Sequence, residues 1–434
     1  MIKFSTLIVL FCFLAGCSDD NSVVEEDVFD LSIEITSPFD IKGDIASSGG
    51  NIINEDDHTI LRKGVCYSLT AAPTVNDLLI EHEGVATSFE VNLENLEFNT
   101  VYYARAFAET TNDIFYSDEV SFTTTNECTL NVFEGDVTLT TQTEVDNFAI
   151  NNYCSVTGDL RISEGDATAD PIVDISGLYN LRSLGSIIVS NTTLIESLEG
   201  LHNIDSISNS LAVVGNEQVI NIDEFIKIDT PVRSITVFDN ANLNSIEGIS
   251  NIKELVKYED NLPYLKISDC PLLNSLDPLE GITANDGISG ISIHGLPFIT
   301  NIDALSNISG SIDVLDIFNM TSLQNINGIY SITSVNGRLY LSNNESLNNI
   351  LGFQSITTLS GFISIFNNDL LYNLDAFENV TQISGELEIV GNASLFDFCG
   401  IVDALDENNL DDFSVYQNGF NPTLEDLLNG NCAE

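Results

Sequence analysis

Basic residues are scarce in this sequence. It contains 13 Lys and Arg against 66 Asp and Glu in 434 residues, which gives a formal net charge of -53 at pH 7. A protein that binds nucleic acid by neutralising phosphates needs clustered Lys and Arg, so the composition excludes that class. The acidic residues are spread along the chain and form no tail, which favours a solvated, self-repelling surface. Diffuse binding of divalent cations is the alternative.

Common catalytic motifs are also missing. The sequence has no HExxH, no GxSxG and no GxxxxGK[ST] segment, and its histidines lie far apart, at His58, His82, His202 and His294. An enzyme would need a carboxylate cluster and a base that the spacing hides. The basic residues after residue 126 share no position in the repeat described below: Arg161, Arg182, Lys227, Arg233, Lys253, Lys257, Lys266 and Arg338. We therefore expect no enzyme, no cofactor and no metal site, and leave open only Ca²⁺ in acidic loops.

The N-terminal hydrophobic run is too short for a membrane span. MIKFSTLIVLFCFLAGC has one Lys and then about ten apolar residues, which is typical of a signal peptide. Ala15 and Gly16 before Cys17 resemble the lipobox of bacterial lipoproteins, which implies cleavage after residue 16 and a lipid on Cys17. Ser18-Asp19-Asp20-Asn21 resembles the surface-export signal of Bacteroidetes lipoproteins, and residues 17–29 are expected to be an acidic tether. The resemblance implies an outer-membrane lipid anchor at the cell surface, and the alternatives are an ordinary signal peptide and a plain polar tether.

Residues 30–125 read as an antiparallel sandwich. SIEIT, TILRKGVCYS, SFEVNLENL, VYYARAFAETT and EVSFTTT are short runs of strand-forming residues separated by turn residues. The stretch LEFNTVYYAR resembles the Leu, Thr, Tyr pattern of fibronectin type III domains, which implies that Tyr102 lies at the corner and Leu96 in the core. Cys66 is expected to be a buried, unpaired thiol. The segment is expected to be a spacer.

Residues 127–434 contain a repeat of about 24 residues. Units begin at Gly185, Asn209, Arg233, Pro263, Ser289, Asp313, Gly337, Gly361 and Gly385, with spacings of 24 except for one of 30 and one of 26. Counted from each start, offsets 2 and 4 are apolar in every unit, which predicts one strand with two inward residues. Offsets 10, 13 and 16 are also apolar, and their step of three favours 3₁₀ turns. Stacked units then share one core, with parallel strands in successive turns.

Two further offsets recur. Offset 7 carries an Asn in five units: Asn216, Asn240, Asn344, Asn368 and Asn392, with Cys270 at the same place. An inward Asn amide can bond the main chain of neighbouring turns, so we predict an Asn ladder inside the core; a plain turn role is the alternative. Offset 15 is Gly in five units, Gly200, Gly248, Gly328, Gly352 and Gly400, which we interpret as a tight bend.

This repeat resembles leucine-rich repeats and, more closely, the receptor L-domain family, a right-handed parallel β-solenoid. The resemblance runs from about Cys128 to Cys432 and implies a cap at each end. Thr141 to Glu144 fits a capping box for an N-terminal helix, and NPTLEDLLNGNC reads as a C-terminal one. In this plan Cys128 and Cys154 share the first cap, and Cys399 and Cys432 the last. We predict these two disulfides, with Cys270 left as a core thiol. The cysteine-rich modules and the kinase of the receptors are missing, so their signalling is not implied.

Outward strand positions suggest where a ligand binds. Offsets 1, 3 and 5 carry six aromatic residues in 27 positions, where the chain average of 8% predicts about two: Phe238, Tyr264, Phe318, Tyr340, Phe362 and Phe366. Aromatic side chains on a flat sheet suit sugar stacking or protein contacts. We take Tyr264, Phe318, Tyr340, Phe362 and Phe366 as the candidate binding face. The alternative is that offset 5 turns inward, which would place three of the six in the core.

The sequence thus predicts an all-β, non-enzymatic cell-surface lipoprotein that displays a rigid solenoid. Its membrane contact is the N-terminal lipid, and its expected ligand is extracellular. Adhesion to a protein partner is the first expectation. Glycan binding for a nutrient-uptake system is the second, and is favoured if Tyr340, Phe362 and Phe366 are exposed together.

Overall fold

The structure is a computed structural model of the 434-residue chain, and it describes residues 31–53, 58–125, 127–165, 169–258, 261–285 and 287–434. The predicted signal peptide, Cys17 and the tether lie outside the described residues. The chain divides into two compact units. The first contains the described residues up to Ile41 together with Ala46–Glu94 and Thr100–Thr123, and the second contains Thr124–Glu434 together with Lys42–Ile45 and Asn95–Asn99.

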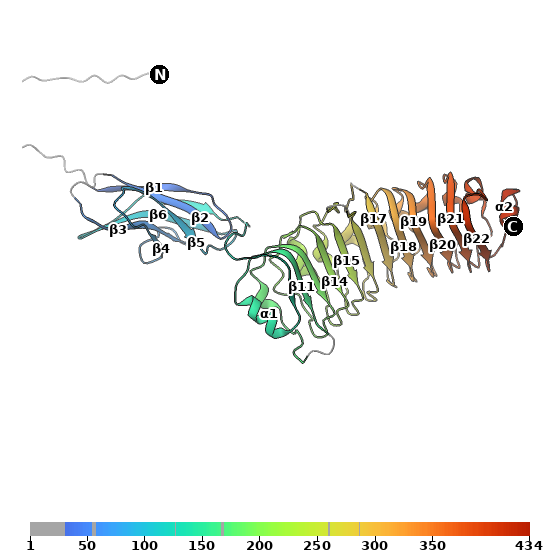
Figure 1. The fold of residues 1–434 in the computed structure, drawn as a ribbon, viewed down its shortest axis with the longest axis horizontal. Helices are drawn as coiled ribbons and strands as arrows, with labels where there is room; N and C mark the ends of the chain where they lie inside the picture. Colours follow the sequence, from blue (N-terminus) through green and yellow to red (C-terminus); the bar gives the residue numbers. More distant parts are fainter. Residues whose placement is uncertain (1–30, 54–57, 126, 166–168, 259–260, 286) are drawn as a thin grey trace, which may run out of the picture. The chain divides into compact units, whose positions relative to one another are not determined.

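The first unit is built from two sheets (Figure 1). One has the order β1 (Ser32–Phe39), β2 (Ile45–Ile53), β5 (Ser88–Glu94); the other has β4 (Leu78–Glu81), β3 (Ile60–Ser68), β6 (Val101–Thr110), β7 (Ile114–Tyr116), with β8 (Val120–Thr123) also on β6. β1 with β2, β3 with β4 and β6, and β6 with β7 and β8 are antiparallel pairs. Their alternating apolar residues are buried. Tyr102 stacks on Phe122 at 5.8 Å in this core, and Cys66 is buried and unpaired.

The second unit is a parallel β-solenoid with a 14-stranded sheet (Figure 1). Its strands are β9 (Val132–Phe133), β10 (Val137–Leu139), β11 (Ser155–Ser163), β12 (Ser183–Ser190), β13 (Ser206–Ile207), β14 (Ser210–Val214), β15 (Ser234–Phe238), β16 (Tyr264–Ser268), β17 (Ile288–His294), β18 (Gly310–Phe318), β19 (Ile332–Ser342), β20 (Thr358–Phe366), β21 (Gln382–Val390) and β22 (Leu410–Tyr416). Leu339 pairs with Ile363, which pairs with Leu387, and all three side chains are at most 2% exposed. The predicted hydrophobic column is therefore present.

Most return paths contain a 3₁₀ helix, as the step of three predicts, whereas the path from β12 to β13 has only turns and the path from β10 to β11 holds α1 (Gln142–Ala149). The 3₁₀ helices are η1 (Ser176–Leu178), η2 (Asp223–Lys227), η3 (Glu247–Ile249), η4 (Asp277–Leu279), η5 (Asp303–Leu305), η6 (Asn327–Ile329), η7 (Leu351–Phe353), η8 (Asp375–Phe377) and η9 (Cys399–Ala404). Their apolar residues complete one continuous core with the inward strand residues. The coils are thus held together by shared burial between neighbours.

The recurrent glycines have a different cause from the one expected. Of the five at offset 15, Gly200 alone has a positive φ, of 107°. At Gly248, Gly328, Gly352 and Gly400 an ideal Cβ would overlap a main-chain carbonyl oxygen of the preceding coil. Close approach between coils, and not a special backbone conformation, therefore excludes a side chain at those four positions.

The Asn side chains form two ladders inside the core. Asn216 bonds Asn240 through Nδ2 to Oδ1 at 3.0 Å, and Asn240 approaches Cys270 Sγ at 3.9 Å. In the second ladder Asn344 bonds Asn368 at 3.1 Å, and Asn368 bonds Asn392 at 3.4 Å. All five predicted Asn residues are 0% exposed, and each also bonds a main-chain carbonyl oxygen of the preceding coil. These Asn side chains therefore form ladders inside the core and do not act only as turn residues.

Both ends of the solenoid are capped. The N-terminal cap holds helix α1 (Gln142–Ala149), whose N-cap Thr141 accepts a hydrogen bond from Glu144 N, and the disulfide Cys128–Cys154. The C-terminal cap holds helix α2 (Leu424–Leu428) and the disulfide Cys399–Cys432. These are the two cysteine pairs that the sequence predicts. Caps of this kind cover the terminal strands of a repeat protein, where unpaired edges invite association.

Candidate functional site

The outer face of the solenoid sheet carries the candidate residues. We use this name for the side that bears offsets 1, 3 and 5. All six aromatic residues at these offsets are partly exposed, and none belongs to the core. Phe238, Phe318 and Phe366 at offset 5 are the last residues of their strands and keep the outward alternation. The alternative that offset 5 turns inward is therefore wrong.

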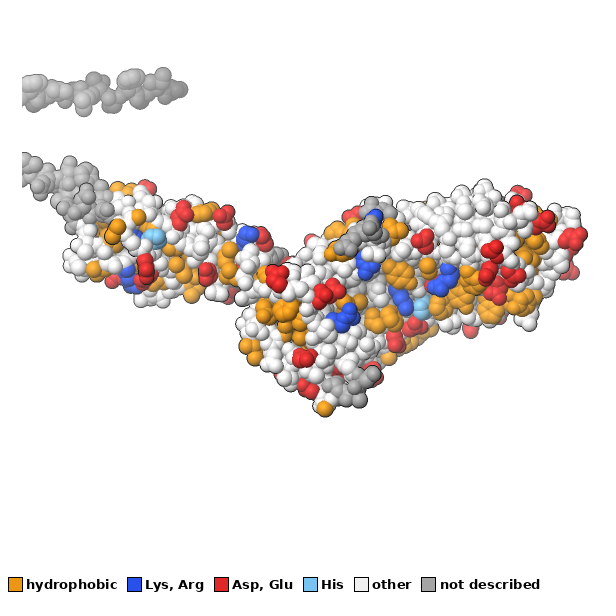
Figure 2. Space-filling model, viewed as in Figure 1, with side chains coloured by type: hydrophobic (Ala, Val, Ile, Leu, Met, Phe, Trp, Pro, Cys, Tyr) orange, Lys and Arg blue, Asp and Glu red, His pale blue; other side chains and the backbone are white. Residues whose placement is uncertain are grey.

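The outer face changes character along the solenoid. From β12 to β15 most outward residues are small: Ser186, Ser190, Ser210, Ala212, Val214, Ser234 and Thr236, beside Ile188 and Phe238. From β16 to β20 large aromatic and charged residues appear, and Glu386, Glu388 and Asp412 follow on β21 and β22. Figure 2 shows hydrophobic, basic and histidine side chains gathered on the middle of this face, with acidic ones nearer the C-terminal end.

A cavity of about 380 Å³ opens on the outer face across β16 to β20. We call it the sheet hollow. Nine residues line it: Tyr264, Lys266, Ser292, His294, Asp316, Phe318, Arg338, Tyr340 and Phe362. Four of the five candidate aromatic residues thus meet around one cavity. Phe366 is the fifth; it lies on the same face next to Ser342 but does not line the sheet hollow.

Ring contacts fix the aromatic walls. The imidazole of His294 stacks on Phe318, with ring centroids 4.0 Å apart and planes 12° apart. Phe318 in turn meets Tyr340 edge to face at 5.4 Å. Gly290 makes room for a third ring, because an ideal Cβ there would overlap the ring of Tyr264. Ring contacts therefore join β17, β18 and β19, and Tyr264 of β16 lies over the backbone of β17.

An ion pair forms part of the floor. Asp316 is only 4% exposed, and its carboxylate accepts two hydrogen bonds from Arg338, from Nε at 2.8 Å and from Nη2. This bidentate geometry holds the guanidinium in one orientation, and it raises the pKa of Arg338. Since half of the Arg338 side chain remains exposed, the fixed guanidinium still faces the solvent.

Lys266 and His294 complete the polar lining. The Lys266 ammonium lies 3.8 Å from the centroid of the Phe238 ring, a cation–π contact. Burial lowers the pKa of His294, and the neighbouring Lys266 lowers it further, whereas Asp269 opposes both. The Nδ1 of His294 lies 3.3 Å from Asp269 Oδ2, although without hydrogen-bond geometry. Through its stacking on Phe318, the imidazole forms part of the aromatic wall.

Sequence reasoning missed the basic residues of this site. Lys266 has offset 3 on β16 and Arg338 has offset 1 on β19, so no shared column connects them. Both nevertheless line the sheet hollow, so the lack of a shared repeat position does not keep them apart in space. The sequence signal that could have found them is the change from small outward residues on β12 to β15 to large and charged outward residues on β16 to β20.

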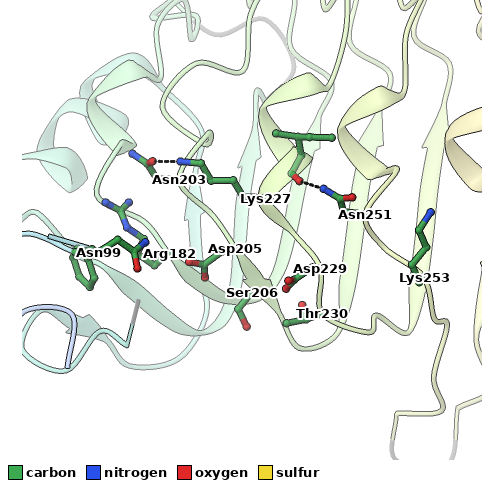
Figure 3. Close-up of a pocket in the computed structure, with 12 residues that line it drawn as sticks. Asn99, Arg182, Asn203, Asp205, Ser206, Lys227, Asp229, Thr230, Asn251 and Lys253 are labelled. Atoms are coloured by element: carbon green, nitrogen blue, oxygen red, sulfur yellow. Dashed lines mark hydrogen bonds between the residues drawn. The ribbon is translucent and has the colours of Figure 1, made fainter. Parts of the chain in front are cut away.

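A second, larger cavity of about 950 Å³ lies on a side of the same unit (Figure 3). Its basic side chains are engaged locally. Lys227 Nζ donates to Asn203 Oδ1 at 2.7 Å, and Lys253 Nζ donates to the main-chain oxygen of Glu280 at 2.8 Å. The labelled side chains in Figure 3 lie in separate rows along successive coils and do not converge on one point. This cavity is therefore a weaker candidate than the sheet hollow.

Within the described residues, one group of three side chains could in principle hold a metal ion: Asp44, Cys128 and Cys154. The two thiols are joined in a disulfide, so they are not metal ligands.

No helix in the described part of the chain is long and apolar enough to cross a membrane. No protein-family model matches the sequence, and no curated protein is significantly similar to it.

Proposed function

We propose that this chain is a non-enzymatic cell-surface lipoprotein whose solenoid binds an extracellular ligand in the sheet hollow. The signal peptide and Cys17 supply the anchor at the outer membrane. The first unit, a fibronectin type III-like sandwich, acts as a spacer, and the second, a receptor L-domain-like right-handed solenoid, acts as the binding module. No cofactor takes part.

The argument for the sheet hollow comes from the repeat itself. Inward positions of every coil serve the shared core, so they are alike from coil to coil. Outward positions are free of that requirement, and Ser, Ala or Thr occupies four of the six on β14 and β15, beside Val214 and Phe238. The aromatic and charged residues on β16 to β20 are therefore not needed for folding, which supports a role in binding.

Size favours a glycan over a protein ligand. Five strands about 4.8 Å apart, with outward residues about 6.6 Å apart along each, define a patch of roughly 300 Å². A standard protein interface needs about 800 Å² on each partner. A volume of about 380 Å³ falls within the usual range for small-ligand pockets, and several rings around a few fixed polar groups suit a sugar ring. The ligand we favour is thus the one that the sequence alone ranks second.

Protein adhesion remains the second candidate because the apolar surface continues beyond the sheet hollow. Phe366 pairs with Val390, which pairs with Tyr416; Val390 is 1% exposed, so Phe366 and Tyr416 supply the exposed part of this row on β20 to β22. A partner that covers this row as well would use the sheet hollow as the centre of a larger interface.

A glycan array tests the proposal. The wild-type chain should bind a subset of glycans, and Tyr340→Ala and Phe362→Ala should each weaken that binding at least tenfold. Tyr372→Ala is the matched control, since Tyr372 is 57% exposed but lies outside the strands of the sheet. Binding that survives both hollow variants unchanged contradicts the proposed site.

The same variants separate the two candidates. Phe366→Ala leaves the sheet hollow intact and should leave glycan binding intact. If no glycan binds, and a captured protein partner is lost with both Phe366→Ala and Tyr340→Ala, protein adhesion is the function.

A further inference from the structure

The sheet hollow reverses the charge balance of the chain as a whole, as does the larger cavity, whose lining has three basic and two acidic residues. Basic residues are 13 of 434, so nine average positions would contain fewer than one. The sheet hollow contains two, Lys266 and Arg338, and a single acidic residue, Asp316. A cavity with more cations than anions, on a chain of net charge -53, needs an explanation that solubility does not supply.

The single carboxylate does not cancel both cations. Asp316 is buried, and both of its carboxylate oxygens accept hydrogen bonds from Arg338. Its negative charge is therefore paired with Arg338 and not with Lys266. Among the described residues, Lys266 Nζ has no ion-pair or hydrogen-bond partner. The third guanidinium nitrogen of Arg338, Nη1, likewise has no acceptor in the described part of the chain. Two donors with positive charge therefore remain available on the walls of the sheet hollow.

The geometry distinguishes these donors from ordinary surface cations. An exposed Lys usually lies free in solvent and needs no ligand. Here the ammonium is held against the Phe238 ring, and the guanidinium is held by a buried carboxylate. Burial of an ion pair costs desolvation and is weak as a source of stability, so the Asp316–Arg338 pair is better explained by the orientation it gives to Arg338. Groups that are fixed in advance lose less entropy when a ligand arrives.

We propose that the sheet hollow receives a carboxylate-bearing sugar residue, an inference that rests on the proposed glycan binding. The sugar ring lies against the aromatic walls of Tyr264, Tyr340 and Phe362. Its carboxylate lies at Arg338 Nη1, which Asp316 on β18 holds in place, while Lys266 Nζ, held on Phe238 of β15, meets the carboxylate of a neighbouring sugar residue; both contacts are charge-assisted hydrogen bonds. The ligand class is therefore the acidic polysaccharides, such as those that contain hexuronates.

The acidic surface around the site adds to selectivity. Glu386 and Glu388 follow on β21, and Asp269 lies beside His294. Glu386 pairs with Phe362, and Asp269 lies 3.3 Å from His294, so these carboxylates border the sheet hollow and repel an anion at those edges. They also repel a polyanion that lies elsewhere on the surface. Only an anionic sugar that fits the sheet hollow gains a net attraction.

Paired ligands test the inference on the full chain. Fragments of several carboxylated polysaccharides are compared with the same fragments after chemical reduction of each carboxyl group to a hydroxymethyl group, by isothermal titration calorimetry. We expect the acidic member of at least one pair to bind about tenfold more tightly or better. Lys266→Gln should remove most of that difference without changing binding of the reduced member, and Lys266→Arg should restore it.

Arg161→Gln is the matched control. Arg161 lies at an outward position of the same sheet, on β11, is exposed, and changes the net charge by the same amount. If Arg161→Gln lowers affinity for the acidic member as much as Lys266→Gln does, the effect is general electrostatics and the inference is wrong.

The remaining outcomes separate this inference from the proposed function. Equal affinity for acidic and reduced members, lost in both cases with Tyr340→Ala, overturns the carboxylate inference and leaves glycan binding standing. Binding of no acidic member, with no glycan bound on the array, overturns both.

Discussion

The Asn ladder offers the sharpest test of the solenoid core. Asn368 is fully buried, and its Oδ1 accepts two hydrogen bonds from Asn344, from the main-chain N at 3.2 Å and from Nδ2 at 3.1 Å. Asn368→Leu keeps a side chain of similar size and removes that acceptor. A buried donor without a partner costs about 1–3 kcal/mol, so two of them cost about 2–6 kcal/mol. A whole domain is typically stable by about 5–15 kcal/mol, so the change is a large fraction of the total.

A second substitution tests the reasoning more closely. Asn344→Leu alone leaves one donor unpaired, the main-chain N of Met320, which bonds Asn344 Oδ1 at 3.1 Å. Separately, the two substitutions leave three donors without partners. The double variant leaves only two donors without partners, the main-chain N of Met320 and of residue 344, because the side-chain amide of Asn344 is no longer present. We therefore expect the double variant to cost about 1–3 kcal/mol less than the sum of the singles.

Urea unfolding followed by far-ultraviolet circular dichroism measures these free energies. Asn379→Ala is the matched control, since the exposed Asn379 amide makes one bond to the preceding coil, to Gln354 O at 2.9 Å, and should cost less than about 1 kcal/mol. A cost for Asn368→Leu as small as that of the control, or strict additivity with Asn344→Leu, would refute the view that unpaired donors set the energy.

Three further predictions concern the same unit. Gly328→Ala should lower the free energy of unfolding by more than about 2 kcal/mol, because its Cβ would overlap a carbonyl oxygen of the preceding coil, while Gly165→Ala, with open space around it, should be nearly neutral by the same urea assay. Burial raises the pKa of the Cys270 thiol to about 11, so at pH 8 it should resist alkylation in the folded chain and react after denaturation, as mass spectrometry can show; fast reaction of the folded chain contradicts its burial. Replacing Cys399 and Cys432 by Ser should cost about 3–4 kcal/mol, since the bridge closes a loop with a sequence separation of 33 residues; an unchanged urea midpoint contradicts this.

The solenoid was predictable because its information is local and repeated. Each coil repeats the same inward positions, so Leu339, Ile363 and Leu387 identify their column without any structure. The Asn ladder was predictable for the same reason. Asn418, which continues the ladder by accepting from Asn392 Nδ2 at 3.0 Å, was missed because it follows Asn392 by 26 residues and not by 24.

The strands of the first unit were predictable only where their side chains are large. β2 has the sequence IASSGGNII, and its Ser and Gly residues give no strand pattern. The structure requires them, because an ideal Cβ at Gly49 would overlap the Phe89 carbonyl oxygen on β5. A residue chosen for close approach between strands looks like a turn residue in the sequence.

The charged part of the site could not be predicted, because it depends on diagonal contacts. Arg338 at offset 1 reaches Asp316 at offset 3 of the preceding strand, while the residue directly beside it is Val314. A comparison of residues at the same offset in successive repeats therefore does not reveal the Arg338–Asp316 pair. The aromatic residues were found because their number on one face exceeds what composition predicts, and that excess does not depend on which residues touch.

The bare backbone at Gly290 has an evolutionary consequence. Tyr264 can lie over β17 because nothing projects from the sheet at that point. A mutation of this one codon to a larger residue would displace the ring and reshape the sheet hollow while the inward core residues stayed in place. The outer face of the solenoid can therefore change in a single step without loss of the fold.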